Sequence, residues 1–377
     1  MRTWQINEPV GISQQSDPFR PRVAPMRVQA GLIALGILLL TFGAGTSCSQ
    51  PLYTARARNL SVSAANEILR RQSSDGAITM GTNGADGTQV EPYFANLAAI
   101  GLADAFALTH DNRYSSAVRR WIAWYEAHMS ATGVVDDYGG RSGARVSLHT
   151  HDSVDSYAGT YLYAVLREYD VTRDKGWLAA QFPYVKRALL AIASVTTRYG
   201  LTIAKPSYAI MYTMDNVETM NGLRSAAKIA AVLGHKLVAR DAAVRAQKMQ
   251  RGLRKYLWRS AEHAYAVAMA PNGVVTRGLS SWYPDIMANL MAIAWQRQSK
   301  KRIQLFDRLY AAHLAMCTSP VTGQSRFEQV LWWAMAAKRC GQMTTYQQLL
   351  SKLESNAGML NKLSNTALLG HVCRLTS

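Results

Sequence analysis

The stretch HTHDSVDSYAGTYLYAVLREY, residues 149–169, joins a polar, acidic head to an apolar helical segment. Asp152 and Asp155 are three residues apart, so a helix would place both on one face of its first turn. Paired carboxylates at the mouth of an apolar helix suit acid and base chemistry. Aspartates also cap helices and interact favourably with the positive end of the helix dipole. The stretch alone favours neither interpretation, so the rest of the chain has to decide.

Comparable apolar segments recur along the chain and alternate with charged amphipathic segments. The apolar segments begin near residues 91, 152, 215, 283, 326 and 363. An alternation of exposed and buried helices is the pattern of a closed or stacked helical array. Nearly all of these segments begin with an acid, and the last begins with Asn365. The acids are Glu91, Asp152 with Asp155, Asp215 with Glu218, Asp285, and Glu328.

This alternation, with polar heads on the apolar segments, resembles the (α/α)6 toroid of the six-hairpin glycosidase-like superfamily, over about residues 55–377. The resemblance implies an all-α fold in which six inner helices form a barrel and six outer helices wrap it, with short β-hairpins in the loops. It also implies that the N-termini of the inner helices surround a sugar-binding cleft. Cellulase-type members carry a Gly-rich segment after the first acid, whereas here Pro92, Tyr93 and Phe94 follow Glu91. The resemblance therefore leaves the substrate open.

The acids at the helix heads are candidates for glycoside hydrolysis. That reaction needs one carboxylic acid to protonate the leaving oxygen and a second carboxylate, roughly 5–9.5 Å away, as base or nucleophile. Asp152 and Asp155, three residues apart on one helix, would be close neighbours. We therefore expect the two catalytic carboxyl groups to come from two different helices. We predict that Asp152 or Asp155 acts together with Asp215 or Asp285. Which of them is the acid stays open, because that depends on burial and neighbouring charge.

Each acid also has a purely structural interpretation. The spacing of Asp215 and Glu218 fits a capping box, and Glu91 fits a helix cap. Asp285 suits the helix dipole wherever it stands near a helix start. Glu328 is expected to pair with the neighbouring arginine or to lie on the rim of the site.

Aromatic and polar residues gather at the same helix heads and are predicted to bind the sugar. Aromatic rings with a polar edge suit sugar faces, and amides or imidazoles can hydrogen-bond to hydroxyls. Core packing is the alternative for the rings. The histidine spacing is not that of a helical metal site, so we expect neither a metal nor a cofactor. The predicted substrate-binding residues are Glu91, Tyr93, Asn96, His149, His151, Tyr157, Tyr208, Tyr212, Asn216, Glu218, Trp282 and Tyr283.

Residues 1–50 are predicted to be a targeting region ahead of a single domain, residues 51–377. The apolar run AGLIALGILLLTFGA, residues 30–44, is short for a membrane span and typical of a secretory signal. Small residues precede Cys48, as at a bacterial lipoprotein processing site, although Gly45 replaces the usual Leu-like residue. We expect an exported, envelope-attached protein, periplasmic and lipidated at Cys48, or else held by an uncleaved N-terminal anchor.

The composition narrows the choice of partners. With 42 Lys and Arg against 24 Asp and Glu, the chain has a formal charge of +18. Such a charge favours an anionic neighbour, either a membrane surface or an acidic polysaccharide. The basic residues are spread along the chain without a nucleic-acid motif, so we do not expect nucleic acid as a partner. Cys317, Cys340 and Cys373 lack paired spacing, which predicts buried thiols or at most one disulfide.

Together these features predict an exported glycoside hydrolase, a monomer, that acts on a polysaccharide, with an acidic exopolysaccharide as candidate substrate. Two alternatives stay open. One is a polysaccharide lyase that uses tyrosine or histidine around a uronic acid. The other is a non-catalytic protein that binds glycans or takes part in exopolysaccharide assembly.

Overall fold

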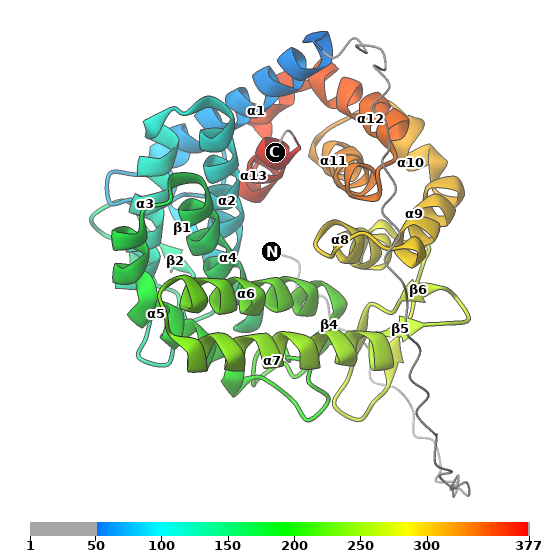
Figure 1. Ribbon diagram of the computed structural model, residues 1–377. Coiled ribbons are helices and arrows are strands. Elements are labelled where there is room, and N and C mark those ends of the chain that lie inside the picture. The colour runs from blue at the N-terminus through cyan, green and yellow to red at the C-terminus, as the bar shows by residue number, and fades with distance from the viewer. Residues whose placement is uncertain (1–50, 376–377) are drawn as a thin grey trace, which may run out of the picture. The chain divides into compact units, whose positions relative to one another are not determined.

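The computed structural model describes residues 51–375, whose helices form an inner and an outer layer around a ring (Figure 1). Outer and inner helices alternate along the chain, which confirms the predicted all-α (α/α)6 toroid. The inner helices are α2 (Pro92–Thr109), α4 (Asp155–Thr172), α6 (Thr213–Val232), α8 (Met287–Ala294), α11 (Gln324–Cys340) and α13 (Thr366–Arg374). The outer helices are α1 (Pro51–Arg71), α3 (Asn112–Ala127), α5 (Lys175–Ser194), α7 (Lys236–Gly252), α9 (Lys300–Ala312) and α12 (Met343–Ser355), and short α10 (Leu314–Thr318) precedes α11.

The ring closes between the two ends of the described chain. Each inner helix contacts the next along the sequence, and the last, α13, packs against both α2 and α1. Thr366 Oγ1 donates a hydrogen bond to the carbonyl oxygen of Thr79 at 2.7 Å. Ser61 Oγ donates to the carbonyl oxygen of Cys373 at 3.3 Å. The first and last hairpins are therefore joined by backbone-directed contacts as well as by packing.

Glycines set the spacing of two inner-helix pairs. A Cβ added at Gly101 of α2 would lie 2.5 Å from the Cα of Gly370 in α13. A Cβ added at Gly222 of α6 would lie 2.5 Å from the Cα of Gly159 in α4. Real Cβ atoms do not approach this closely, so the two helix pairs can touch backbone to backbone only because both partners lack side chains. Small residues at a crossing point allow this close approach.

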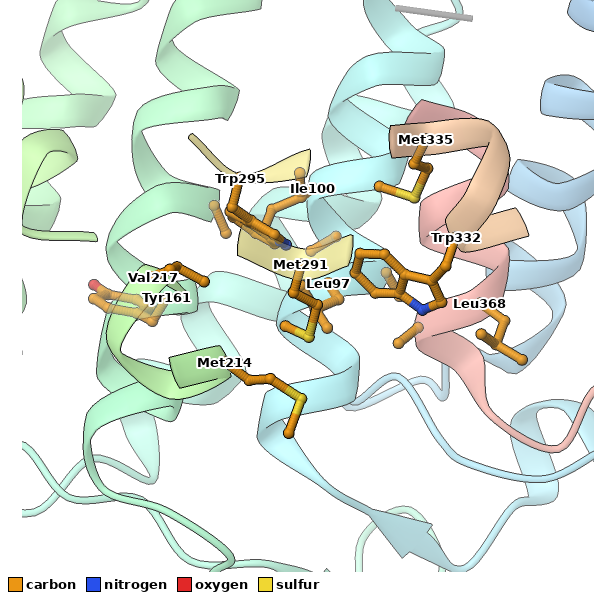
Figure 2. Packing of buried hydrophobic residues seen from close by; sticks show 14 of the residues in the cluster. Leu97, Ile100, Tyr161, Met214, Val217, Met291, Trp295, Trp332, Met335 and Leu368 are labelled. Carbon is orange, nitrogen blue, oxygen red and sulfur yellow. The ribbon is translucent and has the colours of Figure 1, made fainter. Parts of the chain in front are cut away.

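Apolar side chains from the inner helices fill the middle of the ring. Figure 2 shows Met214 from α6, Met291 from α8 and Trp332 from α11 converging there, close to Leu97 of α2. All four are buried. This apolar filling provides a low-dielectric surrounding for any polar group at the adjacent ends of the inner helices.

Short strands connect the helices, as predicted, in antiparallel sheets of two or three strands. One of these hairpins is formed by β7 and β8, with Met269 opposite Val275. The strands are β1 (Gln89–Val90), β2 (Tyr138–Gly139), β3 (Val146–Ser147), β4 (Met211–Tyr212), β5 (Trp258–Arg259), β6 (Ala264–Tyr265), β7 (Ala268–Met269) and β8 (Val275–Thr276). Short helical turns are η1 (Gly84–Asp86), η2 (Leu253–Leu257), η3 (Trp282–Ile286) and η4 (Ala357–Lys362).

Several helix starts differ from the sequence expectation. Helix α4 begins at Asp155, which leaves Asp152 in the loop before it. Helix α6 begins at Thr213 and helix α11 at Gln324, so their acids lie inside the helices. The expected signal or anchor segment and Cys48 lie outside the described residues. Among residues 51–375, no helix combines the length and apolar character needed to cross a membrane.

The glycine contacts lead to a first prediction. Gly222→Ala should lower the free energy of unfolding by about 1–3 kcal/mol, because the added methyl group forces α4 and α6 apart. Urea or thermal unfolding of the purified variant measures the change. Gly358→Ala is the matched control, since no atom lies within 4 Å of a Cβ at that position and its φ is not positive. Equal stability of the two variants would contradict the proposed backbone contact.

Candidate active site

Acidic side chains from three inner helices and their loops form one interacting group, the carboxylate cluster. Its members are Glu91 before α2, Asp137 before β2, Asp152 before α4, Asp155 at the start of α4, and Asp215 and Glu218 in α6. Burial raises the pKa of Glu91, Asp137 and Asp215, and the charge of Asp152 raises each of them further. Because charges perturb one another strongly only at close range, these carboxyl groups lie together at one end of the ring.

Asp155 is the most tightly held member of the cluster. Its side chain is fully buried, Oδ2 accepts a hydrogen bond from Thr202 Oγ1 at 2.6 Å, and Oδ1 accepts from the backbone N–H of Ser156 at 2.9 Å. Burial raises the pKa of Asp155 to about 7 despite these bonds, and the charge of Glu218 raises it further. Asp155 is therefore shielded from solvent and acts on its surroundings through its charge.

Asp215 is the accessible member of the buried set. It remains partly exposed, while Asp155 and Glu218 are buried. Burial of its carboxyl group, and then the charges of Asp155 and Asp152, hold the pKa of Asp215 well above its usual range. A carboxyl group whose pKa is raised in this way and that still reaches solvent has the properties required of a general acid.

Glu218 follows Asp215 by three residues on α6. The Tyr93 hydroxyl group donates a hydrogen bond to Glu218 Oε1 at 2.9 Å. Burial and the charge of Asp215 hold the pKa of Glu218 well above its usual range, although Tyr93 and Arg374 oppose the shift. This hydrogen bond links the head of α2 to α6 and fixes the Tyr93 ring beside the cluster.

The outer part of the cluster is centred on Asp152. Asp152 is exposed, and its backbone N–H donates to Tyr157 Oη at 3.3 Å. Tyr157 in turn donates to Asp137 Oδ1 at 2.8 Å. Burial raises the pKa of Asp137 to about 6 and that of Glu91 to about 7. An exposed carboxylate thus stands beside partly buried ones with raised pKa values.

Capping does not account for the acids of this cluster. Asp111 and Asp174 do cap outer helices α3 and α5, because each accepts a backbone N–H from its own helix. Glu91 occupies the cap position of α2 but makes no such bond. Asp215 is the third residue of α6, whose cap position is Tyr212, so the predicted capping box at Asp215 is wrong. Among the inner acids, Asp155 accepts the backbone N–H of Ser156 in its own helix. Glu91 and Asp215 lack the capping bond that the outer acids make.

The predicted aromatic residues gather around the cluster. The rings of Tyr93 and Tyr157 stack with centroids 6.2 Å apart, and the hydroxyl groups of Tyr208 and Tyr212 are 2.8 Å apart. Tyr283 is 62% exposed. Partial desolvation, and then the charges of Asp215 and Asp152, raise its pKa to about 12. Trp282, by contrast, packs partly buried against the hydrophobic core.

The side chains of three predicted site residues are hydrogen-bonded to the protein itself. Asn96 and Asn216 are fully buried, and both amides are hydrogen-bonded to protein, for example Asn216 Oδ1 to the backbone N–H of Thr202 at 2.8 Å. Asp285 Oδ2 accepts the backbone N–H groups of Ser280 and Ser281 at 3.2 and 3.1 Å. The two asparagines therefore build the wall, which corrects their predicted binding role. Asp285 organises the loop before α8, and its catalytic role stays a prediction.

The histidines and Glu328 lie at the edge of the site. His149 is exposed with a left-handed backbone, φ 53°, and His151 Nδ1 lies 3.1 Å from Asp136 Oδ1. No group of three or more metal-ligating side chains occurs among residues 51–375. Burial raises the pKa of Glu328 to about 7. Arg326 donates instead to Gln329 Oε1 at 2.6 Å, so the ion pair expected between Arg326 and Glu328 is not formed.

Sequence reasoning missed Asp137 and Thr202. Asp137 belongs to the Gly-rich loop GVVDDYGG, residues 133–140, and pairing of β1 with β2 brings that loop beside Glu91. The adjacent acids Asp136 and Asp137 were a usable signal, since acids in a loop next to a predicted site are candidates for it. Thr202 carries no such signal, because threonines are common in turns.

Comparisons with known proteins support the fold. No protein-family model and no curated protein sequence matches this chain. An α-amylase from Clostridium perfringens is 11% identical, with a TM-score of 0.55 over 85% of this chain and 97% of its own. A rhamnosidase from Klebsiella oxytoca with rhamnose bound is 12% identical, with a TM-score of 0.59 over 88% of this chain and 64% of its own.

A GH63 mannosylglycerate hydrolase from Thermus thermophilus in complex with glucose is 12% identical. Its TM-score is 0.58 over 82% of this chain and 98% of its own. At these identities the likeness establishes the fold. The predicted resemblance to the six-hairpin glycosidase-like toroid is thereby confirmed as an architecture.

The raised pKa values predict an unusual dependence of stability on pH. The folded protein holds protons on Asp155, Glu91 and Glu328 that the unfolded chain releases above about pH 4. Folding stability should therefore fall as pH rises from about 4 to about 7. Asp155→Asn should flatten this slope and stabilise the protein at pH 8 more than at pH 5.5.

Urea midpoints at pH 5.5 and 8 measure both effects. Asp111→Asn is the control, because hydrogen bonds to Arg113 lower the pKa of Asp111, which is ionised in both states over this range. If the stability of the Asp155→Asn and Asp111→Asn variants changed equally between pH 5.5 and pH 8, Asp155 would not be buried as described.

Proposed function

We propose that this protein is a glycoside hydrolase that uses Asp215 as general acid and Asp152 as the second carboxylate. The observation that carries the proposal is Asp215 itself, a partly exposed carboxyl group whose burial and acidic neighbours raise its pKa well above the usual range. A neighbouring exposed carboxylate, Asp152, comes from a different inner hairpin. Two carboxyl groups in different environments are the requirement for this reaction.

The proposed chemistry divides the work between these two groups. Asp215 donates its proton to the glycosidic oxygen as the bond from that oxygen to the anomeric carbon breaks. Asp152 assists the attack on the anomeric carbon, either by removing a proton from water or by bonding to the carbon before water replaces it. The water oxygen ends on the sugar with one of its protons, as the new anomeric hydroxyl group. Its other proton replaces the one that Asp215 gave away, either directly or by way of Asp152 and solvent, so that Asp152 is again a carboxylate. Asp155 is a positioning residue, because it is buried and acts through the pKa of Asp215.

The surroundings suit a sugar substrate. Tyr283 and Tyr208 are exposed rings beside the cluster, and such rings pack against the apolar faces of sugars. Several proteins with a similar fold carry names that describe action on sugars, including a β-1,3-1,4-glucanase from Paenibacillus. We extend the substrate to a polysaccharide, with an acidic exopolysaccharide as the specific candidate.

The electrostatics favour hydrolysis over the lyase alternative. A lyase tyrosine has to lose its proton to act as a base. Burial and nearby carboxylates instead raise the pKa of Tyr93 and Tyr157 well above the ordinary value. The same carboxylates argue against a purely binding role, because burying several acids lowers stability at neutral pH, and only Asp155 among them bonds to a backbone N–H at a helix start.

We also propose that the protein is exported and attached to the cell envelope as a monomer. The export and the envelope attachment rest on the apolar run at residues 30–44 and on Cys48. Labelling with a fatty-acid analogue in cells would detect lipidation, and Cys48→Ser would remove the label without altering the toroid.

The catalytic assignment is tested by screening polysaccharides for new reducing ends. Asp215→Asn and Asp152→Asn should each lower kcat/KM by about 10²–10⁴-fold on any substrate found, while leaving the fold intact. Asp111→Asn, a conservative change at an outer helix cap, should stay within about twofold of the wild type. Products that absorb in the near ultraviolet would identify a lyase instead. Full activity of Asp215→Asn would exclude the assignment.

The pH profile provides a separate test of the role of Asp155. Activity should fall on the alkaline side as Asp215 loses its proton. Because the charge of Asp155 helps to hold the pKa of Asp215 high, Asp155→Asn should move this alkaline limb to lower pH. A reduced kcat without any shift of the limb would indicate that Asp155 has only a structural role.

A further inference from the structure

A basic hollow lies between the turn that follows α5 and the C-terminal half of α7. Its volume is about 720 Å³. Its lining includes Arg198, Arg245, Lys248, Arg251 and Lys255, with Asp241 as the acid and Tyr199 and Tyr256 as the rings. The basic side chains outnumber the acid by four, and no other function described above uses them.

The charge of the hollow is available to a ligand. Within residues 51–375, neither Lys248 nor Arg251 has a hydrogen-bond or ion-pair partner, and both are exposed. Two other cations of the lining have partners: Arg245 pairs with Asp241 at 2.9 Å and donates to the Leu189 carbonyl at 3.1 Å, and Arg198 donates to Tyr199 Oη at 3.0 Å. Unpaired cations that line a concave surface attract anions more strongly than isolated charges do.

Aromatic rings form part of the same lining. Tyr199 and Tyr256 are half-buried and pack edge to face with centroids 5.1 Å apart. Arg198 lies 5.0 Å from the centroid of the Tyr199 ring, and Lys255 lies 5.0 Å from that of Tyr256. The hollow thus combines flat rings for sugar faces with cations for carboxylates.

A small hairpin connects this hollow to the carboxylate cluster. Thr197 and Leu201 are joined by a backbone hydrogen bond of 2.8 Å, with Arg198, Tyr199 and Gly200 at the tip. The tip lies against α7, where a Cβ added at Gly200 would be 3.1 Å from the Lys248 carbonyl oxygen. The residue after this hairpin, Thr202, holds Asp155. The hollow and the cluster are therefore neighbours across one short turn.

We propose that this hollow is an accessory binding site for an acidic polysaccharide, which it holds by its uronic acid carboxylates next to the active site. The cation-lined concavity suits a polymer strand better than a flat membrane. The exposed Leu237 of α7 does not line it. The inference goes beyond the proposed function because the hollow contains no member of the carboxylate cluster, while its assignment to a glycan rests on that function.

The test measures binding without turnover. Full-length protein carrying Asp215→Asn is titrated with hexagalacturonate and with its fully methyl-esterified, uncharged form. The acidic oligomer should bind, with an affinity that falls steeply as salt is added, and the ester should bind at least about tenfold more weakly. Equal affinity for the two oligomers, or no binding of the acid form, would overturn the proposal.

Matched charge reversals locate the site. The double variant Lys248→Glu with Arg251→Glu should weaken binding of hexagalacturonate at least about tenfold. Lys236→Glu with Arg240→Glu reverses the same number of charges on α7 outside the hollow, and should change affinity less than about twofold. All four positions are exposed, so both variants should fold, which a thermal melt checks. Equal losses of hexagalacturonate affinity in the two double variants would show a general effect of charge and overturn the proposed binding site.

Vesicles containing phosphatidylglycerol provide the competing outcome. If the hollow variant lost vesicle binding while hexagalacturonate did not bind, the surface would be a membrane contact and the proposal would fail. The affinity result is independent of catalysis. If Asp215→Asn kept full hydrolytic activity, the catalytic assignment would fail while the binding site could still be established by the reversals.

Discussion

Closure of the helical ring is the constraint on which the rest of this structure depends. Neighbouring inner helices touch in chain order, but the contact of α13 with α2 joins segments more than 250 residues apart. That contact is close because Gly101 and Gly370 meet backbone to backbone. The heads of α2, α4 and α6 are held together by the direct contacts of α2 with α4 and of α4 with α6, and the contact of α13 with α2 completes this arrangement. Acids that are scattered in sequence then become neighbours.

The carboxylate cluster works against stability, and this distinguishes it from ordinary helix capping. Asp174 satisfies a backbone N–H of α5 and has a lowered pKa because of that bond and its contact with Arg119. Asp155 and Glu218 interact with their acidic neighbours in an apolar surrounding, and burial together with those charges raises their pKa values. A folded protein retains such an arrangement when function requires it, because each buried acid reduces stability at neutral pH.

Much of the architecture could be predicted from the sequence, because alternating apolar and amphipathic segments leave few ways to bury the apolar faces. The same pattern placed Glu91, Asp155, Asp215 and Glu218 at helix heads, and the structure brings them together. Their catalytic roles stay predictions. The pattern of apolar residues did not predict the direction of individual side chains. Asn216 accepts a hydrogen bond from the backbone N–H of Thr202, and Asp285 accepts one from the backbone N–H of Ser281 in its own loop. Asp137 joined the cluster through a strand pairing of only two residues.

Ring closure also bears on how the chain can fold. The other contacts between inner helices join segments that are nearer in sequence, so they form with less loss of chain entropy. The side of α2 that receives Gly370 stays uncovered until the last hairpin has been synthesised. During synthesis, this apolar flank of α2 with Gly101 therefore stays exposed until α13 has been made. Within residues 51–375, α13 (Thr366–Arg374) covers that flank, so this helix belongs structurally with α1 and α2, far away in the sequence.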